Sequence, residues 1–486
     1  MADEPGESSD VLADRRRKLE ALRADGVEPF PHAYPGVVAI AGVRARHAGL
    51  GDGEETDVAH RVAGRLAARR GQGKMAFLDL VDRSGRIQLQ ARADVLGAEA
   101  MARLLSFDLG DLIGVDGTAF SSRRGELTLR VDHFALLAKS LRPPPDKHHG
   151  LTDVATRFRQ RELDLIANEE ARALFFTRAR VITAVRRFLD DAGFIEVETP
   201  VLQALYGGAM ARPFVTHHNA LDRDLYLRIA TELYLKRLIV GGLERVYEIG
   251  KNFRNEGVDT THNPEFTVLE WYEAYADYTD IATRCEQLVH AAGQAVGYAG
   301  EIDLTPPWRR ETLAGAILQR TGVNILAARD RDALAAAMRA RDLPVPENES
   351  WPQLVDELLS RYVEPMLVQP TFLLDFPVEI SPLAKAHRTT PGLVERFEAF
   401  IGGMEIANAF TELNDPDEQR RRFESQRRLA LAGDDEAQPY DEAFVQALEY
   451  GMPPTGGIGI GIDRLVMVMT GTRSIREVVL FPAMRD

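Results

Sequence analysis

The chain has 486 residues, a net charge of −15, 45% hydrophobic and 27% charged residues, as expected for a globular protein of roughly two or three domains. It has no run of about 18 apolar residues, so no segment is predicted to span a membrane. The acidic start, MADEPGESSD, lacks the basic and apolar regions of a secretory signal. Cys285 is the only cysteine, which excludes an internal disulfide and makes a reducing cytoplasm the expected location.

The net charge argues against a nucleic-acid partner, but the charge is unevenly distributed. The segment from Arg61 to Arg92 holds eight basic residues and two acidic ones, Asp79 and Asp82, so its local charge is +6. In an acidic chain such a segment is either a phosphate-binding footprint or a well-solvated domain surface. Charge alone leaves these two interpretations equal.

Residues 1–57 are predicted to form a disordered tail, over residues 1–8, and one helix. Ser9 or Asp10 is a suitable N-cap for this helix, which should end near Gly26. The basic run Arg15–Lys18 is expected to be a solvated face or a secondary contact for nucleic acid.

Residues 58–140 have the pattern of a small β-barrel. Turn signals such as Arg83-Ser84-Gly85 separate short segments rich in strand-forming residues, and one helical stretch lies near Ala98–Leu105. The expected strands are Val62–Arg69, Ala76–Val81, Arg86–Arg92, Leu112–Phe120 and Glu126–His133. Five strands with one interposed helix favour an OB-fold barrel, a fold that often binds oligonucleotides.

Residues 141–150, LRPPPDKHHG, contain three consecutive prolines and are typical of a stiff linker. Residues 151–486 are predicted to form a second, larger domain of the α+β class, with a mainly helical insertion at about 308–368.

The most informative segment runs from Glu244 to Tyr278 and is predicted to form a strand, a polar loop and a returning strand. Because side chains alternate along a strand, Phe266, Val268, Glu270 and Tyr272 should share one face. An amphipathic strand with Glu270 in solvent is the simpler interpretation. The density of polar groups in the loop, with Arg254, Glu256, His262 and Asn263, favours a small-molecule site instead.

The sequences FRNE (253–256) and HNPEF (262–266) resemble motif 2 of the class II aminoacyl-tRNA synthetases, in its lysine-specific form. The resemblance implies an antiparallel sheet with flanking helices in residues 151–486. It also implies that Arg254 bridges the ATP α-phosphate and the amino-acid carboxylate, and that Phe266 stacks on adenine. Glu256, His262 and Asn263 are implied to help hold the nucleotide.

Two other stretches resemble further motifs of the same family. GIGIGIDRLVMVMTG, from Gly457, is similar to motif 3, which implies that Arg464 reaches the ATP γ-phosphate. FLDDAGFIEVETPVL, residues 188–202, is similar to motif 1, whose helix, strand and Pro200 imply a homodimer interface. Neither the HIGH nor the KMSKS signature of class I synthetases is present.

The resemblance also implies which amino acid is used. A lysine ammonium in a partly desolvated site requires carboxylates on rigid elements. In the lysine-specific family, the positions matching Glu270, Tyr272 and Glu412 surround this ammonium. Glu232 and Gly208 are implied to hold the α-amino group, and Asn408 and Phe410 to complete the wall. A related enzyme for aspartate would need a basic group in place of Glu270.

The resemblance further implies several Mg²⁺ ions, held by Glu405 and Glu412, with Glu405 also on the ATP side. These two residues are seven apart, so strict strand alternation would place them on opposite faces, and a bulge or twist must intervene. Two residues depart from the family pattern. Met404 replaces a basic residue beside Glu405, and Glu162 replaces an aromatic residue.

The barrel is expected to bind the tRNA anticodon. By strand alternation Phe77 faces away from Leu78 and Leu80, and Gln88 faces away from Ile87 and Leu89. With Arg70 they would form a stacking and hydrogen-bonding platform for a splayed base, and they match the anticodon readers of the family. Two alternatives are a paralogue that lysylates a protein or a lipid, and a non-catalytic binding protein on the same fold.

Overall fold

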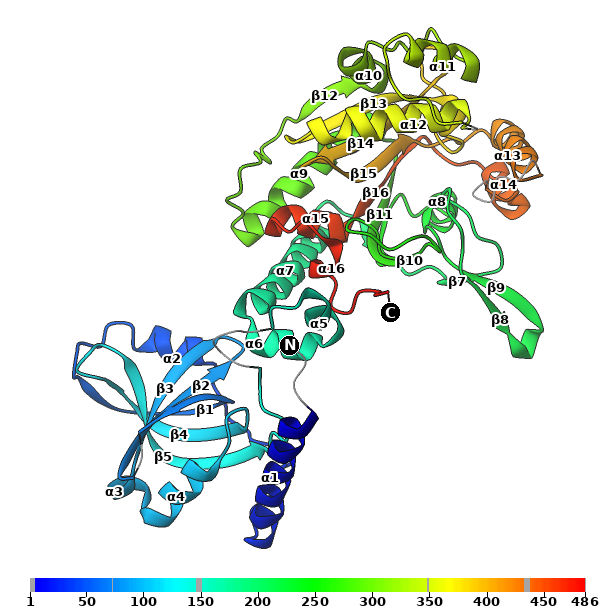
Figure 1. Ribbon diagram of the computed structural model, residues 1–486. Coiled ribbons are helices and arrows are strands. Elements are labelled where there is room, and N and C mark those ends of the chain that lie inside the picture. Colours follow the sequence, from blue (N-terminus) through cyan, green and yellow to red (C-terminus); the bar gives the residue numbers. More distant parts are fainter. Residues whose placement is uncertain (1–4, 72, 146–150, 348, 432–437, 486) are drawn as a thin grey trace. The chain divides into compact units, whose positions relative to one another are not determined.

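The computed structural model describes residues 5–71, 73–145, 151–347, 349–431 and 438–485. It divides into two compact units, Met1–Thr152 and Asp153–Asp486 (Figure 1). The division falls directly after the Pro-rich segment 141–150, of which residues 146–150 lie outside the described part.

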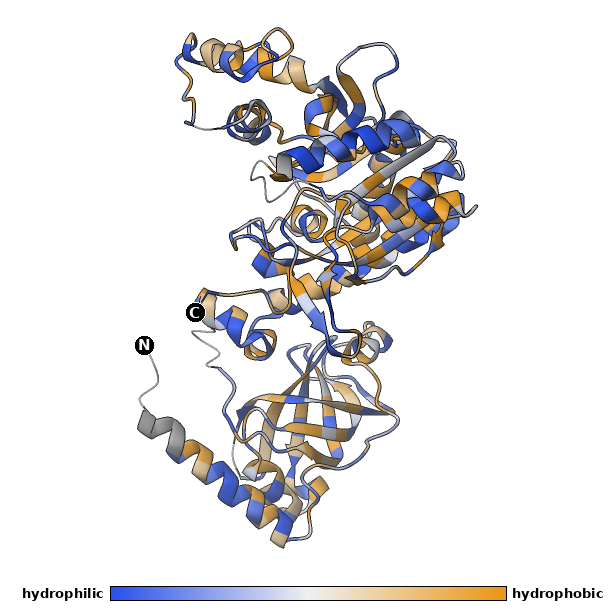
Figure 2. Ribbon diagram, turned by 90° about the vertical axis from the view of Figure 1, so that its right-hand side faces the viewer, coloured by the Kyte–Doolittle hydropathy of each residue, from blue (hydrophilic) through white to orange (hydrophobic). Residues whose placement is uncertain are grey.

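The first unit contains a closed five-stranded barrel in the order β1-β2-β3-β5-β4, which confirms the predicted barrel. Leu78, Leu80, Ile87 and Leu89 are fully buried inside it. In Figure 2 its strands alternate between hydrophobic and hydrophilic colours, as expected when one face of each strand points inward. The strands are β1 (Glu55–Arg70), β2 (Met75–Asp82), β3 (Gly85–Arg92), β4 (Leu112–Ser121) and β5 (Leu127–Ala138); α3 (Ala93–Leu96) and α4 (Ala98–Ser106) follow β3.

Two helices, α1 (Pro5–Ala24) and α2 (Ile40–Arg46), precede the barrel. The start of α1 at Pro5 corrects the prediction that residues 5–8 belong to a disordered tail. The basic run on α1 is not a uniformly solvated face either. Arg15 is 7% exposed and donates hydrogen bonds of 2.9, 3.2 and 3.0 Å to the carbonyl oxygens of Ser140, Arg142 and Leu109.

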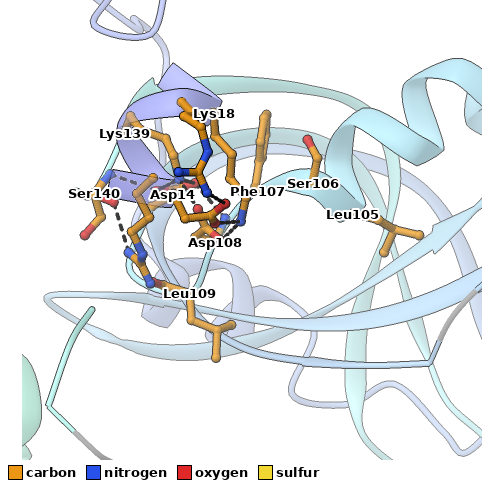
Figure 3. A network of polar contacts seen from close by, with 12 residues as sticks. Asp14, Lys18, Leu105, Ser106, Phe107, Asp108, Leu109, Lys139 and Ser140 are labelled. Carbon is orange, nitrogen blue, oxygen red and sulfur yellow. Dashed lines mark hydrogen bonds and ion pairs between the residues drawn. The ribbon is translucent and has the colours of Figure 1, made fainter. Parts of the chain in front are cut away.

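A polar network at the end of the barrel explains why α1 turns basic residues inward (Figure 3). Lys18 Nζ lies 2.7 Å from Asp108 Oδ1. Lys139, whose side chain is 1% exposed, lies 2.6 Å from Asp108 and 2.9 Å from the fully buried Asp111. The ammonium groups of Lys18 and of Lys139, directly after β5, therefore pair with the partly buried Asp108 and the buried Asp111, which would otherwise destabilise the fold.

The second unit is built on an eight-stranded sheet in the order β12-β13-β14-β15-β16-β11-β10-β6, with a separate three-stranded sheet β7-β9-β8. The β12–β13 and β10–β6 pairs are parallel and the others are antiparallel. The strands are β6 (Ile195–Glu196), β7 (Leu202–Gln203), β8 (Val215–His218), β9 (Arg223–Leu227), β10 (Arg245–Phe253), β11 (Glu265–Ala274), β12 (Arg309–Thr312), β13 (Thr371–Pro377), β14 (Leu393–Ile401), β15 (Met404–Thr411) and β16 (Thr455–Gly461).

Helices α7 (Glu169–Asp191), α9 (Tyr278–Val296) and α15 (Ile462–Thr470) share the largest hydrophobic core with one face of this sheet. Leu269 and Trp271 of β11 are fully buried in that core. The opposite face of β11 is therefore left for a site. The remaining elements are α5 (Val154–Arg159), α6 (Arg161–Ala167), α8 (Glu232–Val240), α13 (Pro416–Leu431), α14 (Glu442–Glu449), α16 (Ile475–Val478), η1 (Asn219–Leu221), η2 (Glu364–Met366) and η3 (Val378–Ile380).

The predicted insertion at about 308–368 is mainly helical, with α10 (Leu313–Thr321), α11 (Arg331–Arg339) and α12 (Trp351–Tyr362). It differs from the prediction in its first element, because β12 adds an edge strand parallel to β13. The three helices share a second hydrophobic core with Leu373 of β13 and Phe400 of β14.

Candidate active site

A cavity of about 450 Å³ lies on the face of β11 that points away from the large core. Residues of α8, β11, β14, β15, β16 and α15 line it, together with the loop between β10 and β11. The structure brings almost all of the predicted nucleotide and amino-acid residues to this cavity. They are Gly208, Glu232, Arg254, Glu256, His262, Asn263, Phe266, Glu270, Tyr272, Glu405, Asn408, Phe410 and Arg464; Glu412 does not line it.

The glycines of β16 determine how the floor of the cavity is assembled. Gly459 lies opposite Glu270 of β11 on one side and opposite Asn408 of β15 on the other. Gly457 lies in the same way between Tyr272 and Phe410. Because the central strand has no side chains at these positions, side chains of β11 and β15 can meet across it. A Cβ on Gly457 would lie 2.4 Å from Tyr272 Cε1.

Glu270 is the carboxylate at the centre of this floor. Its Oε1 accepts a hydrogen bond of 3.1 Å from the backbone N–H of Thr231, and its Oε2 accepts one of 3.3 Å from the Tyr272 hydroxyl. Burial, and after it the nearby Glu232 carboxylate, raise the pKa of Glu270 to about 7. The raised pKa means that burial disfavours the ionised form of Glu270, and a cation beside this carboxylate would stabilise that form.

Lys236 is a buried partner of this floor that the sequence analysis missed. Its fully buried ammonium lies 2.5 Å from Glu232 Oε1 and is also paired with Glu412. Burial alone would lower the pKa of Lys236, but these two carboxylates raise it. Burial raises the pKa of both Glu232 and Glu412, although Lys236 opposes the shift. The i,i+4 spacing of Glu232 and Lys236 on a helix was a signal for this pair.

A second group of residues forms the nucleotide side. The Arg254 guanidinium lies 5.2 Å from the centroid of the Phe266 ring. Among the described residues, the buried Nε of Arg254 has no hydrogen-bond partner. Arg464 donates to the Glu405 carbonyl oxygen at 2.7 Å, and its Nη2 lies 3.2 Å from His262 Nε2. Two guanidinium groups beside an aromatic ring provide charge and stacking surface for a nucleotide.

The other two predicted nucleotide residues lie at the ends of the loop. Glu256 is exposed on the cavity rim. Asn263 is buried, where it donates to the Glu265 carbonyl oxygen at 2.5 Å and accepts from the backbone N–H of Ala483 at 3.1 Å. Asn263 therefore holds the loop in place through its own side chain.

Of the predicted metal pair, the structure brings Glu405 to the cavity and does not bring Glu412 there. A bulge does occur where it was expected, because Ala399 pairs with Ala407 whereas Phe400 pairs with Glu405. It turns Glu405 into the cavity, but Glu412 stays fully buried against Lys236. Glu398 lines the cavity together with Glu405, as do Glu232, Glu256, Glu270 and Asp463. Over the described part of the chain, no three His, Cys, Asp or Glu side chains are arranged to hold a metal by themselves.

Arg396 of β14 is another residue that the sequence analysis missed. Its Nε donates to Asn408 Oδ1 at 3.1 Å, and its Nη2 donates to Glu398 Oε1 at 2.6 Å. Its Nη1 donates to the Ile380 carbonyl oxygen at 2.7 Å. One guanidinium therefore orients Asn408 on the floor and Glu398 on the nucleotide side.

On the barrel, the three predicted anticodon residues share the outward face of neighbouring strands. Arg70 lies opposite Phe77, and Gln88 lies opposite Asp79. Asp79 accepts a hydrogen bond of 3.1 Å from Arg70, and Gln88 Oε1 accepts one of 3.1 Å from Thr128. Phe77 is half-buried.

The basic segment that includes Arg70 is partly structural. Arg61 is paired with Asp116 at 2.6 Å. Arg65 and Arg69 donate to the carbonyl oxygens of Gly110 and Phe107, at 2.8 and 3.0 Å. These side chains stabilise the barrel, so the +6 charge of the segment overstates the charge that a phosphate backbone would meet.

The two departures from the family pattern have different surroundings. Met404, at the start of β15, packs against the large core, so it places no charge beside Glu405. Glu162, in the first turn of α6, is exposed.

Comparison with known proteins agrees with this arrangement. Residues 153–485 match the family described as tRNA synthetases class II (D, K and N), and residues 60–137 match the OB-fold nucleic acid binding domain. Proteins named Lysine--tRNA ligase from Synechococcus sp. (strain CC9311) and Roseiflexus castenholzii are 52% and 53% identical; the alignments cover 98% and 99% of this chain and 99% of each relative. The one from Moorella thermoacetica is 51% identical over 98% of both chains.

No helix in the described ranges is long and apolar enough to cross a membrane. The two family matches fall within the two compact units, and the relatives match along almost the whole chain. The chain therefore belongs to the class II tRNA synthetases, in the branch of the lysine--tRNA ligases.

Proposed function

We propose that the chain activates L-lysine with ATP, forming lysyl-adenylate and pyrophosphate, and transfers the lysine to the 3′ end of tRNA(Lys). One observation supports lysine as the amino acid. Glu232 and Glu270 line the cavity, Glu412 is buried behind its floor, and Lys236 is the cation that Glu232 and Glu412 hold. A floor with this excess of negative charge favours a substrate with an ammonium side chain and disfavours aspartate.

The first step needs no general base, because the carboxylate of lysine is already ionised at neutral pH. It attacks the α-phosphorus of ATP, and pyrophosphate leaves. Arg254 supports this step, since its unpaired Nε is available to a ligand beside Phe266. Arg464 is oriented by Glu405 and His262 to meet the phosphate tail. Catalysis then rests on positioning and on stabilisation of charge.

The residues of the nucleotide side also fit Mg²⁺, which prefers carboxylate oxygen ligands. We propose Glu405 and Glu398 as these ligands, because both line the cavity. Glu412 is not included, since it does not line the cavity. When bound, Mg²⁺ would neutralise charge on the phosphate oxygens.

The second step uses tRNA. The terminal ribose attacks the acyl carbon of the adenylate, through the 3′-hydroxyl as in class II enzymes; the bond from this carbon to the phosphate oxygen breaks and AMP leaves. We assign anticodon binding to Arg70, Phe77 and Gln88, because these side chains lie on one outward face of an OB-fold barrel. A half-buried aromatic ring next to an amide and a guanidinium is suited to a splayed base.

We also propose a homodimer in the cytoplasm. The edge strand β6 and the chain after it expose apolar side chains, with Ile195, Val201 and Leu202 at 52%, 41% and 49% exposure. Exposed apolar residues on a sheet edge are typical of an interface. The single cysteine, Cys285, is buried and unpaired, which suits a reducing compartment.

Pyrophosphate exchange measured against all twenty amino acids tests the proposed function. We expect exchange that depends on lysine and Mg²⁺ and does not need tRNA. Exchange with aspartate or asparagine and none with lysine would overturn the specificity. Lysine-dependent exchange without aminoacylation of tRNA would instead favour a paralogue that modifies another acceptor.

A further inference from the structure

We propose that Lys236 is a resident counter-charge that sets the net charge of the amino-acid pocket and so selects a substrate with two ammonium groups. This inference rests on the proposed function, because it explains how the same pocket recognises lysine. It gives Glu412 a different task from the one implied by the family resemblance: Glu412 holds Lys236, and the substrate side chain is left to Glu270.

The contacts of Lys236 fix its position. It projects from α8, one turn after Glu232, and its ammonium is paired with both Glu232 and Glu412. The side chains of Lys236 and Glu412 have no exposed surface. Three aromatic rings surround the ammonium, with the centroids of Tyr272, Phe410 and Phe444 at 6.0, 5.9 and 6.0 Å. A cation enclosed in this way is part of the fold and does not leave when substrate binds.

The charges of the pocket then balance only with lysine. When all four groups are ionised, Glu232, Glu270 and Glu412 contribute three negative charges and Lys236 contributes one positive charge, which leaves a net charge of −2. Lysine has two ammonium groups that can pair with these carboxylates, and its own carboxylate is proposed to bind Arg254. Buried charge that is not compensated is costly, so an amino acid with a neutral side chain would leave one carboxylate unpaired.

The arrangement also separates the two ammonium groups of the substrate. Within the described part of the chain, the oxygens of Glu270 accept hydrogen bonds from two neutral donors, the Thr231 N–H and the Tyr272 hydroxyl, and have no cationic partner. Glu270 is therefore the carboxylate on the floor that is available to the ε-ammonium. Glu232 lines the cavity beside Gly208 while it shares Lys236, so it can take the α-ammonium at the same time.

A charge-restoration experiment tests this role. Lys236→Met and Glu412→Gln each change the pocket charge by one, and the double variant restores it to −2. We expect each single variant to raise the KM for lysine in pyrophosphate exchange by about tenfold or more, with the KM for ATP changed less than about twofold. The double variant should return to within about threefold of the wild-type lysine KM. Lys251→Met is the matched control, because Lys251 is exposed on β10 and does not line the cavity.

The outcomes are distinguishable. A double variant that folds but remains about tenfold or more above the wild type in lysine KM would overturn the inference and leave the proposed function intact. A lysine KM that does not change in either single variant would do the same. If Lys236→Met does not fold, the lysine KM of the double variant, compared with that of the wild type, still tests the inference. A wild-type protein that does not use lysine at all would overturn the proposed function itself.

Discussion

Gly457 of β16 and Glu412 are so close that a Cβ on the glycine would lie 2.2 Å from Oε1 of the glutamate. The same Cβ would lie 2.4 and 2.6 Å from ring atoms of Tyr272. Both of these side chains are buried, so neither can move aside easily. The glycine of this strand is therefore required by the amino-acid side of the pocket, and not only by close approach of a nucleotide.

The first prediction compares two glycines of the same strand. Gly457→Ala should lower the free energy of unfolding of the catalytic unit by about 1–3 kcal/mol, because the added methyl overpacks a buried site. Gly459→Ala should cost much less, since its Cβ would lie 3.6 Å from Glu270 Cγ, an ordinary contact. Urea unfolding followed by intrinsic fluorescence measures both. Equal losses would show that the crowding at Gly457 is relieved by its neighbours.

The second prediction concerns Glu270→Gln, which should weaken the use of lysine far more than the binding of ATP. It removes the carboxylate that the buried floor offers to the ε-ammonium, a loss of about 3–5 kcal/mol for a buried pair. The measurement is the KM for lysine and for ATP in pyrophosphate exchange. A lysine KM that changes less than about threefold would place Glu270 outside the pocket.

The third prediction is a pH dependence. Burial raises the pKa of Glu270 to about 7 from its ordinary value of 4.5, so below pH 7 the free protein holds a proton on this carboxyl group. Bound lysine favours the ionised form, so binding should release a proton and weaken by up to about tenfold per pH unit below pH 7. The stability of the free protein changes in the opposite direction. The contribution of Glu270 to the free energy of unfolding falls as the pH rises from 4.5 towards 7, because the unfolded chain loses this proton more easily than the folded one. Bound lysine removes this loss of stability.

Isothermal titration with lysine at pH 6 and pH 8, in buffers of different ionisation enthalpy, would measure the affinity and the proton release. Glu270→Gln is the control, because it cannot ionise and should lose this part of the pH dependence. Binding that is equally tight at both pH values, without proton release, would contradict the third prediction.

The fourth prediction concerns assembly. Light scattering at micromolar concentration should give a dimer, and Ile195→Asp should shift it towards monomer, because a carboxylate on the apolar edge strand β6 would be buried at the interface. Leu318→Asp on α10 is a matched control with similar exposure, 45% against 52%. A wild-type protein that is monomeric and fully active would refute the homodimer.

Much of this site was predictable because strand alternation is a local rule. It placed Glu270 and Tyr272 together, and it correctly put Phe77 and Gln88 on the outer face of the barrel. The bulge near Glu405 could be inferred only as a requirement, since it depends on the pairing of β14 and β15. The ion pair of Glu412 could not be predicted for the same reason, because its partner Lys236 comes from a helix far away in the sequence.

The burial of charged side chains could not be predicted from the sequence. Arg15 lies in a stretch that has the composition of a solvated helix, and Lys236 is followed by a second basic residue, Arg237, yet Arg15 and Lys236 are both buried by contacts with distant elements. Local composition cannot reveal such contacts, because burial depends on which faces meet in the folded chain. The start of α1 at Pro5 was missed for a simpler reason, since Ser9 and Asp10 are both good N-caps.

The last prediction separates the two units. Phe77→Ala should cost about 1–3 kcal/mol in tRNA recognition, because it removes the ring on which a base would stack. Gln88→Ala should have a smaller but similar effect, since the Gln88 amide oxygen already accepts from Thr128 and only its remaining groups can bond a base edge. We expect aminoacylation efficiency to fall by roughly tenfold to a hundredfold for Phe77→Ala.

Pyrophosphate exchange should stay near the wild-type level in both variants, because adenylate formation takes place in the other unit. Val95→Ala is a suitable control: Val95 is 43% exposed on the helix α3 and does not belong to the strand face of Phe77, so its loss should leave both assays unchanged. Equal loss of exchange and aminoacylation in Phe77→Ala would indicate a folding defect and a packing role for the ring. No loss in either assay would show that the barrel does not read the anticodon through these side chains. It would then favour a relative that transfers lysine to an acceptor other than tRNA.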